Sequence, residues 1–195
     1  MAIGELLEVV PAPDQAVECG HDSQRDVVQT ALGLMLPQDY IDLAQTYGSG
    51  IFWVVRHGRK GNYVWVFNPL AQRYLCDTDK VLRMFRKLKD VEGGEFSYNV
   101  HPDKPGLFPW ATDADGCTLS WFTAGPPDEW PIVAYAPDHA FFERFDMPVT
   151  SFLAMCFTRK LTCHLWTDPP LLTPDATMTF ETEATPPLPG PGATR

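Results

Sequence analysis

The sequence predicts an α+β fold, a single domain in which helices flank a central mixed or antiparallel sheet. Apolar residues recur with helical spacing through much of the first fifty positions, whereas short β-branched and aromatic runs separated by turn residues dominate residues 51–145. The chain has 195 residues, of which 45% are hydrophobic, so it can bury about 70% of its unfolded surface in one core. A domain of this size needs neither disulfides nor metals for stability.

Composition divides the chain into three parts. Residues 1–22 are expected to form a peripheral N-terminal arm, in which residues 5–10 make a short helical turn that Pro11 ends. Residues 23–167 are expected to form the domain itself. Residues 168–195 are rich in proline and threonine and poor in aliphatic side chains, so they are expected to form a disordered tail.

Two helices are expected before the first strand. Ser23 and Asp26 have the form of a capping box, and the helix that they begin should stop near Gly33. Pro37 suits the first position of the second helix, and Gly48 suits its C-terminal cap. The second helix has an apolar face that is expected to be buried, made of Tyr40, Ile41, Leu43, Ala44 and Tyr47.

The hydrophobic period then changes from that of a helix to that of a strand. Residues 51–55 and 63–67 are β-branched and aromatic, and they are predicted to pair as a hairpin across a polar turn. A helix should follow, capped by Asp77 or Thr78 and ended by Gly93-Gly94. Its apolar positions are Val81, Phe85 and Leu88, and its other face gathers Lys80, Arg83, Arg86, Lys87 and Lys89.

Two further hairpins are predicted in the segment that holds three of the six tryptophans. Asp115 and Gly116 form the positive-φ pair favoured in a tight hairpin, between strands that span residues 107–121. Residues 125–128 have the composition of a second turn, and residues 130–135 that of its return strand.

Three more elements complete the expected fold. Residues 96–101 can make a short strand before these hairpins. Residues 141–145 are expected to be the final strand, and residues 148–161 have the apolar pattern of a closing helix.

No residue pattern in the chain is typical of a catalytic or metal site. The five histidines share no i, i+4 spacing, and the segment around Ser49 lacks the outer glycine of a nucleophile elbow. Asp113 and Asp115 alternate like the start of a calcium loop, but no carboxylate follows at the required position. The five cysteines are scattered and form no C-x-x-C pair. We therefore expect no enzymatic activity, no metal and no cofactor.

Charge and hydropathy restrict the partners and the location. The net charge of −10 disfavours direct binding to nucleic acid and suits a basic protein partner. Residues 1–50 carry eight acidic side chains against Arg25 alone. No segment approaches the roughly 18 consecutive apolar residues of a membrane span, and the N-terminus lacks a basic leader. We expect a cytoplasmic protein that binds neither nucleic acid nor membrane.

Two groups of short motifs follow one another along residues 24–165. The first group comprises Leu32-Gly33, residues 36–40, Leu43 and residues 47–52. The second group comprises Pro109-Trp110, Asp115-Gly116, Trp121, residues 127–131 and residues 151–153. This order resembles that of SMI1/KNR4 domains, the founding type of the SUKH superfamily.

The resemblance implies an α+β fold with a central sheet and no enzymatic activity. Bacterial members of the superfamily are similar to immunity proteins, which neutralise polymorphic or contact-dependent toxins, many of them nucleases, by binding the toxin domain. Fungal members instead serve as interaction scaffolds in growth and cell-wall regulation. The leading expectation is therefore an immunity protein that occludes a toxin's active groove. The alternative is a regulatory scaffold whose tail and basic helix, around Arg83 and Lys87, contact partners.

An acidic protein that inhibits a basic nuclease needs exposed carboxylates beside aromatic anchors. The tryptophan hairpins provide both kinds of residue. The predicted partner-binding residues are Trp110, Asp113, Asp115, Asp128, Glu129 and Trp130. The alternative left open is that these tryptophans belong to the core and that these acids only solvate turns.

Overall fold

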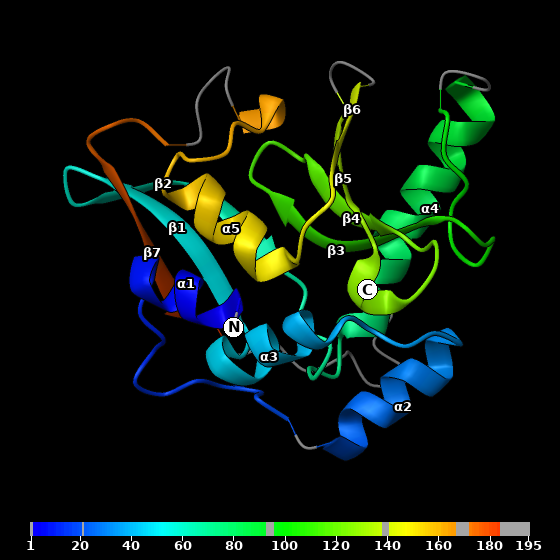
Figure 1. Cartoon of the computed structure of the whole chain (residues 1–195), viewed down its shortest axis with the longest axis horizontal. Helices are drawn as coiled ribbons and strands as arrows, with labels where there is room; N and C mark the ends of the chain where they lie inside the picture. The colour runs from blue at the N-terminus through cyan, green and yellow to red at the C-terminus, as the bar shows by residue number, and fades with distance from the viewer. Residues whose placement is uncertain (1, 21, 93–95, 138–140, 167–171, 184–195) are drawn as a thin grey trace, which may run out of the picture.

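The computed structural model describes residues 2–20, 22–92, 96–137, 141–166 and 172–183. Within these ranges five α-helices and one seven-stranded sheet form a single α+β domain, which confirms the predicted class (Figure 1). The helices are α1 (Ala2–Val9), α2 (Asp22–Leu32), α3 (Gln38–Tyr47), α4 (Tyr74–Glu92) and α5 (Val149–Phe157), with short 3-10 helices η2 (Pro127–Glu129) and η3 (His164–Trp166). No helix of the described segments combines the length and the apolar character required to cross a membrane.

The sheet has the strand order β6-β5-β4-β3-β2-β1-β7, and every neighbouring pair is antiparallel. Its strands are β1 (Gly50–Arg56), β2 (Arg59–Val66), β3 (Leu107–Asp113), β4 (Thr118–Phe122), β5 (Ile132–Ala136), β6 (Phe141–Phe145) and β7 (Ala176–Thr182). The sequence left open whether the sheet is mixed or antiparallel, and the structure shows that it is antiparallel. Short turns join β1 to β2 and β3 to β4 because consecutive antiparallel strands need no crossover, whereas the longer connection from β4 to β5 contains η2.

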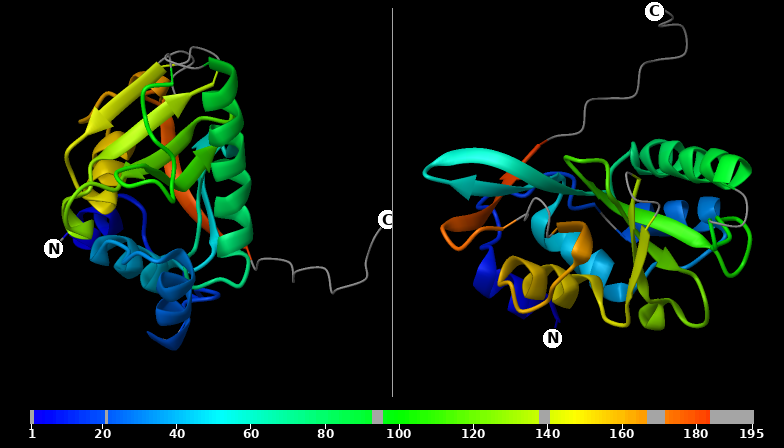
Figure 2. Two further views of the ribbon diagram at one scale, coloured as in Figure 1. Left: turned by 90° about the vertical axis from the view of Figure 1, so that its right-hand side faces the viewer. Right: turned by 90° about the horizontal axis from the view of Figure 1, so that it is seen from above.

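Helices cover the two sides of the sheet unequally. Helices α1, α3 and α5 lie on one side, whereas α4 lies on the other side and over only part of it (Figure 2). Side chains alternate along β1 accordingly: Phe52 and Val54 are buried, while Trp53 and Val55 are half-buried on the α4 side. One end of the sheet therefore keeps an open face.

Aromatic side chains form the centre of the core on the side of α3 and α5. The ring of Trp121 meets that of Tyr40 edge-on at 4.8 Å, and the ring of Trp110 meets that of Phe152 at 6.3 Å. All four side chains are fully buried. Such edge-to-face pairs add to the free energy that area burial alone contributes to folding. The tryptophan hairpins are therefore the middle of the sheet and part of the core.

The N-terminal segment differs from the expected peripheral arm. Leu6 and Val10 are fully buried, and α1 packs on α5. The hydroxyl of Tyr47 also donates a hydrogen bond to the carbonyl of Val10. The physical reason is the i, i+4 spacing of Leu6 and Val10, which gives this short helix a buried face.

The predicted tail also contains a strand of the sheet. Residues 176–182 form β7, which pairs with β1 along its whole length. Met178 is buried, and Phe180 contacts Phe52 with ring centroids 4.8 Å apart. Alternation of these two apolar residues with threonines provides the period of two that a strand needs. The remaining parts of the predicted tail, 168–171 and 184–195, lie outside the described residues.

Several local predictions also differ from the structure, among them the end of the closing helix, which stops at Phe157 rather than at residue 161. Residues 96–101 form only an isolated bridge, between Val100 and Leu107, instead of a strand. Helix α4 begins at Tyr74, one turn before the predicted cap, and its predicted end at residues 93–94 lies outside the described residues. In the β3–β4 turn only Gly116 has a positive φ, because the side chain of Asp113 holds the turn.

Candidate functional site

The two tryptophans predicted as anchors are interior residues. Trp110 is fully buried, and Trp130 is 7% exposed. The indole N–H of Trp130 donates a hydrogen bond to the carbonyl of Gly125 at 3.0 Å, which holds the turn between β4 and β5. In this conformation neither side chain presents an aromatic surface to a partner.

Asp113 is also interior, and it organises the turn between β3 and β4. One carboxylate oxygen accepts hydrogen bonds from the backbone N–H groups of Asp115 and Cys117, at 3.0 and 2.8 Å. The other accepts one from the indole N–H of Trp166 at 2.8 Å. Burial raises the pKa of Asp113 above 3.8, and these three hydrogen bonds oppose that rise. The carboxylate thus joins the hairpin to the segment after α5.

The two predicted acidic turns lie at opposite ends of one strand. Asp115 is in the β3–β4 turn, whereas Asp128 and Glu129 belong to η2 in the connection between β4 and β5. The five residues of β4 separate these turns by about 17 Å. Asp115 is exposed, and its carboxylate accepts a hydrogen bond from Asn62 at 2.9 Å. The predicted acids therefore do not form one patch.

Asp128 lies against the start of α3. Its carboxylate accepts a hydrogen bond from the backbone N–H of Gln38 at 2.7 Å, although the two residues are 90 positions apart. Pro37, the N-cap of α3, makes no side-chain cap. Asp128 therefore supplies the capping acceptor that the local sequence lacks. Glu129, the next residue, is exposed and makes no side-chain hydrogen bond or ion pair with the described residues.

A similar contact joins α3 to α5. The carboxylate of Asp39 accepts hydrogen bonds from the backbone N–H and the hydroxyl of Thr150, at 3.0 and 3.3 Å. Burial raises the pKa of Asp39 above 3.8, while the bonds from Thr150 lower it. Carboxylates thus connect η2, α3 and α5 into one helical layer.

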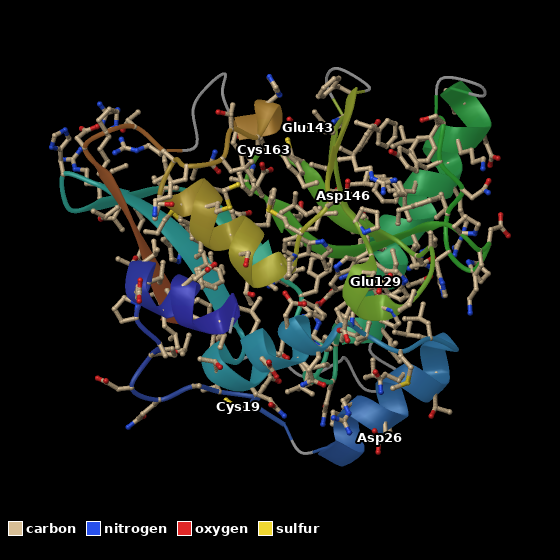
Figure 3. All side chains as sticks on the ribbon, viewed as in Figure 1. Cys19, Asp26, Glu129, Glu143, Asp146 and Cys163 are labelled. Carbon is tan, nitrogen blue, oxygen red and sulfur yellow. The ribbon has the colours of Figure 1, made fainter. Side chains whose placement is uncertain are left out.

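This layer brings together acidic residues from distant parts of the sequence. Helix α3 contacts both α1 and η2, and the three lie in a row in Figure 1, with Glu129 labelled on η2 in Figure 3. The segments α1, α3, α5 and η2 contain no lysine or arginine. We call their exposed carboxylates the acidic helical face, made of Glu5, Glu8, Asp128 and Glu129.

A group of basic residues lies on the opposite side of the sheet. Helix α4 contains five of the basic residues, and the side chains of Lys80 and Arg83 are 53% and 65% exposed. Both pair with acids of the same helix, Lys80 with Asp77 and Arg83 with Asp79. Because α4 holds five basic and four acidic residues, its net charge is only +1, and the sheet separates it from the acidic helical face.

The sequence indicates this face only through the uneven distribution of charge along the chain. The first fifty residues are strongly acidic, but the sequence does not show that α1 and η2 both lie beside α3. The predicted absence of a catalytic or metal site stays a prediction. Among the described residues, no three side chains of histidine, cysteine, aspartate or glutamate gather as a potential metal-binding group. Glu143 and His164 form a smaller titratable pair, in which the ring Nδ1 of His164 lies 2.7 Å from a carboxylate oxygen.

Comparison with known proteins adds no identification. No protein-family model, curated protein or solved structure matches the chain. The similarity to SMI1/KNR4 domains therefore rests on the motifs and their order. The geometry of the acidic helical face is independent of that similarity.

Proposed function

We propose that this protein is a non-enzymatic binding protein, an immunity protein of the SMI1/KNR4 type that neutralises a toxin in the cytoplasm. It does so by placing its acidic helical face in the basic active groove of the toxin domain. The observation that supports the proposal most strongly is the exposure of Glu5, Glu8, Asp128 and Glu129 on α1 and η2, which both contact α3 and, like α3, contain no lysine or arginine. A nuclease toxin is a suitable partner because it presents lysine and arginine to phosphate.

Electrostatics gives this face two advantages in such a complex. Opposite charges speed the encounter of two proteins, and the net charge of −10 acts over the whole molecule. Carboxylates without an internal partner can pair with the toxin at no cost to the fold. Glu8 and Glu129 are such residues, since both are exposed and neither pairs with a described residue.

The other two acids of the face have structural roles as well. Asp128 caps α3, and Glu5 accepts a hydrogen bond from the hydroxyl of Ser151 at 3.2 Å. Substitution of either would change stability and binding together. The charge of the face is therefore best tested at Glu8 and Glu129.

The first experiment identifies the partner from the genes that flank the coding sequence. An adjacent frame that encodes a secreted protein with a small C-terminal toxic domain provides the candidate toxin. Expression of that domain should arrest growth, and co-expression of this protein should restore it. The double substitution of Glu8→Lys and Glu129→Lys should impair the rescue, while the control Asp90→Lys on α4 should not. Equal rescue by both variants would contradict the proposed mode of binding.

A regulatory scaffold is the second candidate, and exposed basic residues of α4 support it. Arg83 and Lys87 are exposed on the side of the sheet away from the acidic helical face. In that case Arg83→Glu and Lys87→Glu, or removal of residues 184–195, should weaken partner binding. The truncation stops after β7, so it leaves every described strand in place. Flanking genes with metabolic or regulatory products would favour this candidate.

A further inference from the structure

The open face of the sheet carries a row of half-buried aromatic side chains. Trp53, Tyr63 and Trp65 point to the α4 side, as shown by their alternation with the buried Phe52 and Val64. The rings of Trp53 and Tyr63 meet edge-on at 5.2 Å. Among the described helices, none lies over β1, β2 and β7 on this side (Figure 2, right). We call these three residues the aromatic row.

A cavity of about 310 Å³ continues the row toward the start of α4. Ile51, Tyr63 and Trp65 form its apolar wall, Arg73 lines it from the turn before α4, and Asp77 lines it from the first turn of α4. The Nε–H of Arg73 is buried and has no hydrogen-bond acceptor among the described residues. Another nitrogen of the guanidinium lies 3.6 Å from the carboxylate of Asp77. The site thus combines flat apolar rings with a guanidinium that is only partly satisfied.

These features suit a proline-rich segment. Proline rings stack on aromatic side chains, and the polyproline II helix leaves its carbonyl groups free to accept hydrogen bonds. A carbonyl of such a segment would accept a hydrogen bond from the exposed part of the Arg73 guanidinium, whose side chain is 25% exposed. An extended segment of this kind loses little conformational entropy on binding, because its prolines already restrict it.

The chain contains a segment of this composition next to the cavity. Glu183 lies on the rim, and its backbone N–H donates a hydrogen bond to the carbonyl of Ser49 at 3.1 Å. The sequence then continues for twelve residues that include Pro-Pro-Leu-Pro at 186–189. Three residues span at most about 11 Å, so Pro186 begins within that distance of Glu183 whatever path the chain takes.

We propose that the aromatic row and the adjacent cavity form a binding site for a polyproline segment, and that residues 186–189 of the same chain occupy it. The short connection gives the segment an effective concentration in the millimolar range. An intrinsic dissociation constant on the order of 1 mM therefore suffices for half-occupancy. The proposal does not rest on the proposed immunity function, since the site lies on the α4 side of the sheet.

The test compares the full chain with a full-length variant that carries Pro186→Ser, Pro187→Ser and Pro189→Ser. These changes keep the length of the chain and leave all described elements intact. In two-dimensional ¹H–¹⁵N spectra, the indole resonances of Trp53 and Trp65 should move between the two proteins. The resonance of the buried Trp121 should stay in place and serves as the control. Substitution of Trp53 and Trp65 by Phe, one at a time, assigns their signals.

Two further measurements test occupancy within one molecule. The indole positions in the full chain should not change on dilution, and a peptide of residues 184–195 should shift the variant's signals back at millimolar concentration. Identical indole positions in the full chain and the serine variant would overturn the proposal. Loss of the difference on dilution would also overturn it, since a second copy would then supply the segment.

Discussion

The contact between Asp128 and the start of α3 allows a sharp prediction about stability. The substitution Asp128→Ala removes the acceptor that binds the backbone N–H of Gln38 at 2.7 Å. Pro37 has no side-chain acceptor to replace it, so this N–H becomes dependent on water. The neighbouring substitution Glu129→Ala removes another exposed carboxylate, one that has no partner among the described residues.

The size of the effect follows from the capping role. Loss of an N-terminal cap costs about 1 kcal/mol, within a range of roughly 0.5–2 kcal/mol. In a domain of this length that loss lowers the melting temperature by about 2–4 °C. Asp128→Asn keeps an acceptor oxygen and loses only the charge at the helix N-terminus, which is worth about 0.3–1 kcal/mol. Glu129→Ala should change the free energy of unfolding by less than about 0.5 kcal/mol.

The assay is urea denaturation of the four proteins, followed by tryptophan fluorescence. The midpoints should decrease in the order wild type, Asp128→Asn and Asp128→Ala, with Glu129→Ala close to the wild type. If the alanine variants at positions 128 and 129 unfold at the same urea concentration, Asp128 does not cap α3. The result also decides which carboxylates can report on binding without a change in stability.

Three other substitutions test the fold. Asp113→Ala should lower the free energy of unfolding by about 3 kcal/mol, because two buried donors and one part-buried donor lose their acceptor; a change in the urea midpoint equal to that of an exposed aspartate would contradict this role. Leu6→Ala should cost about 2–5 kcal/mol in the same assay if the N-terminal segment belongs to the core, and almost nothing if it is peripheral. Burial, Lys104 and Arg86 lower the pKa of His101 below 6.5, so the unfolded chain binds the proton more tightly and stability should fall as the pH drops through 6.5. The urea midpoint should therefore fall less between a pH above 6.5 and a pH below 6.5 in His101→Gln than in the wild type. An equal fall in the two proteins would refute this role of His101.

The elements that the sequence predicts well have local determinants. Helix α3 is the clearest example, because its apolar spacing and the glycine after it both lie within eleven residues. All five residues expected on its inner face are buried, and Gly48 has a positive φ of 69°. The β1–β2 hairpin was predicted for the same reason, since aromatic and β-branched residues alternate across a short turn.

The elements that the sequence did not reveal depend on distant partners. Leu6 is buried, and α1 packs on α5, which begins more than 140 residues further along the chain. The residues next to Leu6 in the sequence therefore do not identify this packing partner. Strand β7 has a clear alternation around Met178 and Phe180, but the proline-rich composition of the surrounding segment masks it. Average composition over a long window hides a short strand.

The candidate site shows the same difference between features with local determinants and features that depend on distant residues. The sequence identified Asp128 and Glu129 as acids in a turn, and the structure places both on an exposed surface. The sequence did not show whether Trp110 is a core residue or an exposed binding residue, because a tryptophan in a strand can point to either side of a sheet. The capping role of Asp128 was also hidden, since its partner Gln38 is 90 positions away.

The most direct test of the proposed function is the affinity of the purified protein for the toxin domain encoded beside it, measured at several salt concentrations. The account predicts that binding weakens as salt rises, and that Glu8→Lys with Glu129→Lys reduces affinity by at least about tenfold. Asp90→Lys, on the opposite side of the sheet, should leave affinity nearly unchanged. Equal affinities for the wild type and both variants, with no dependence on salt, would contradict the acidic helical face as the binding surface.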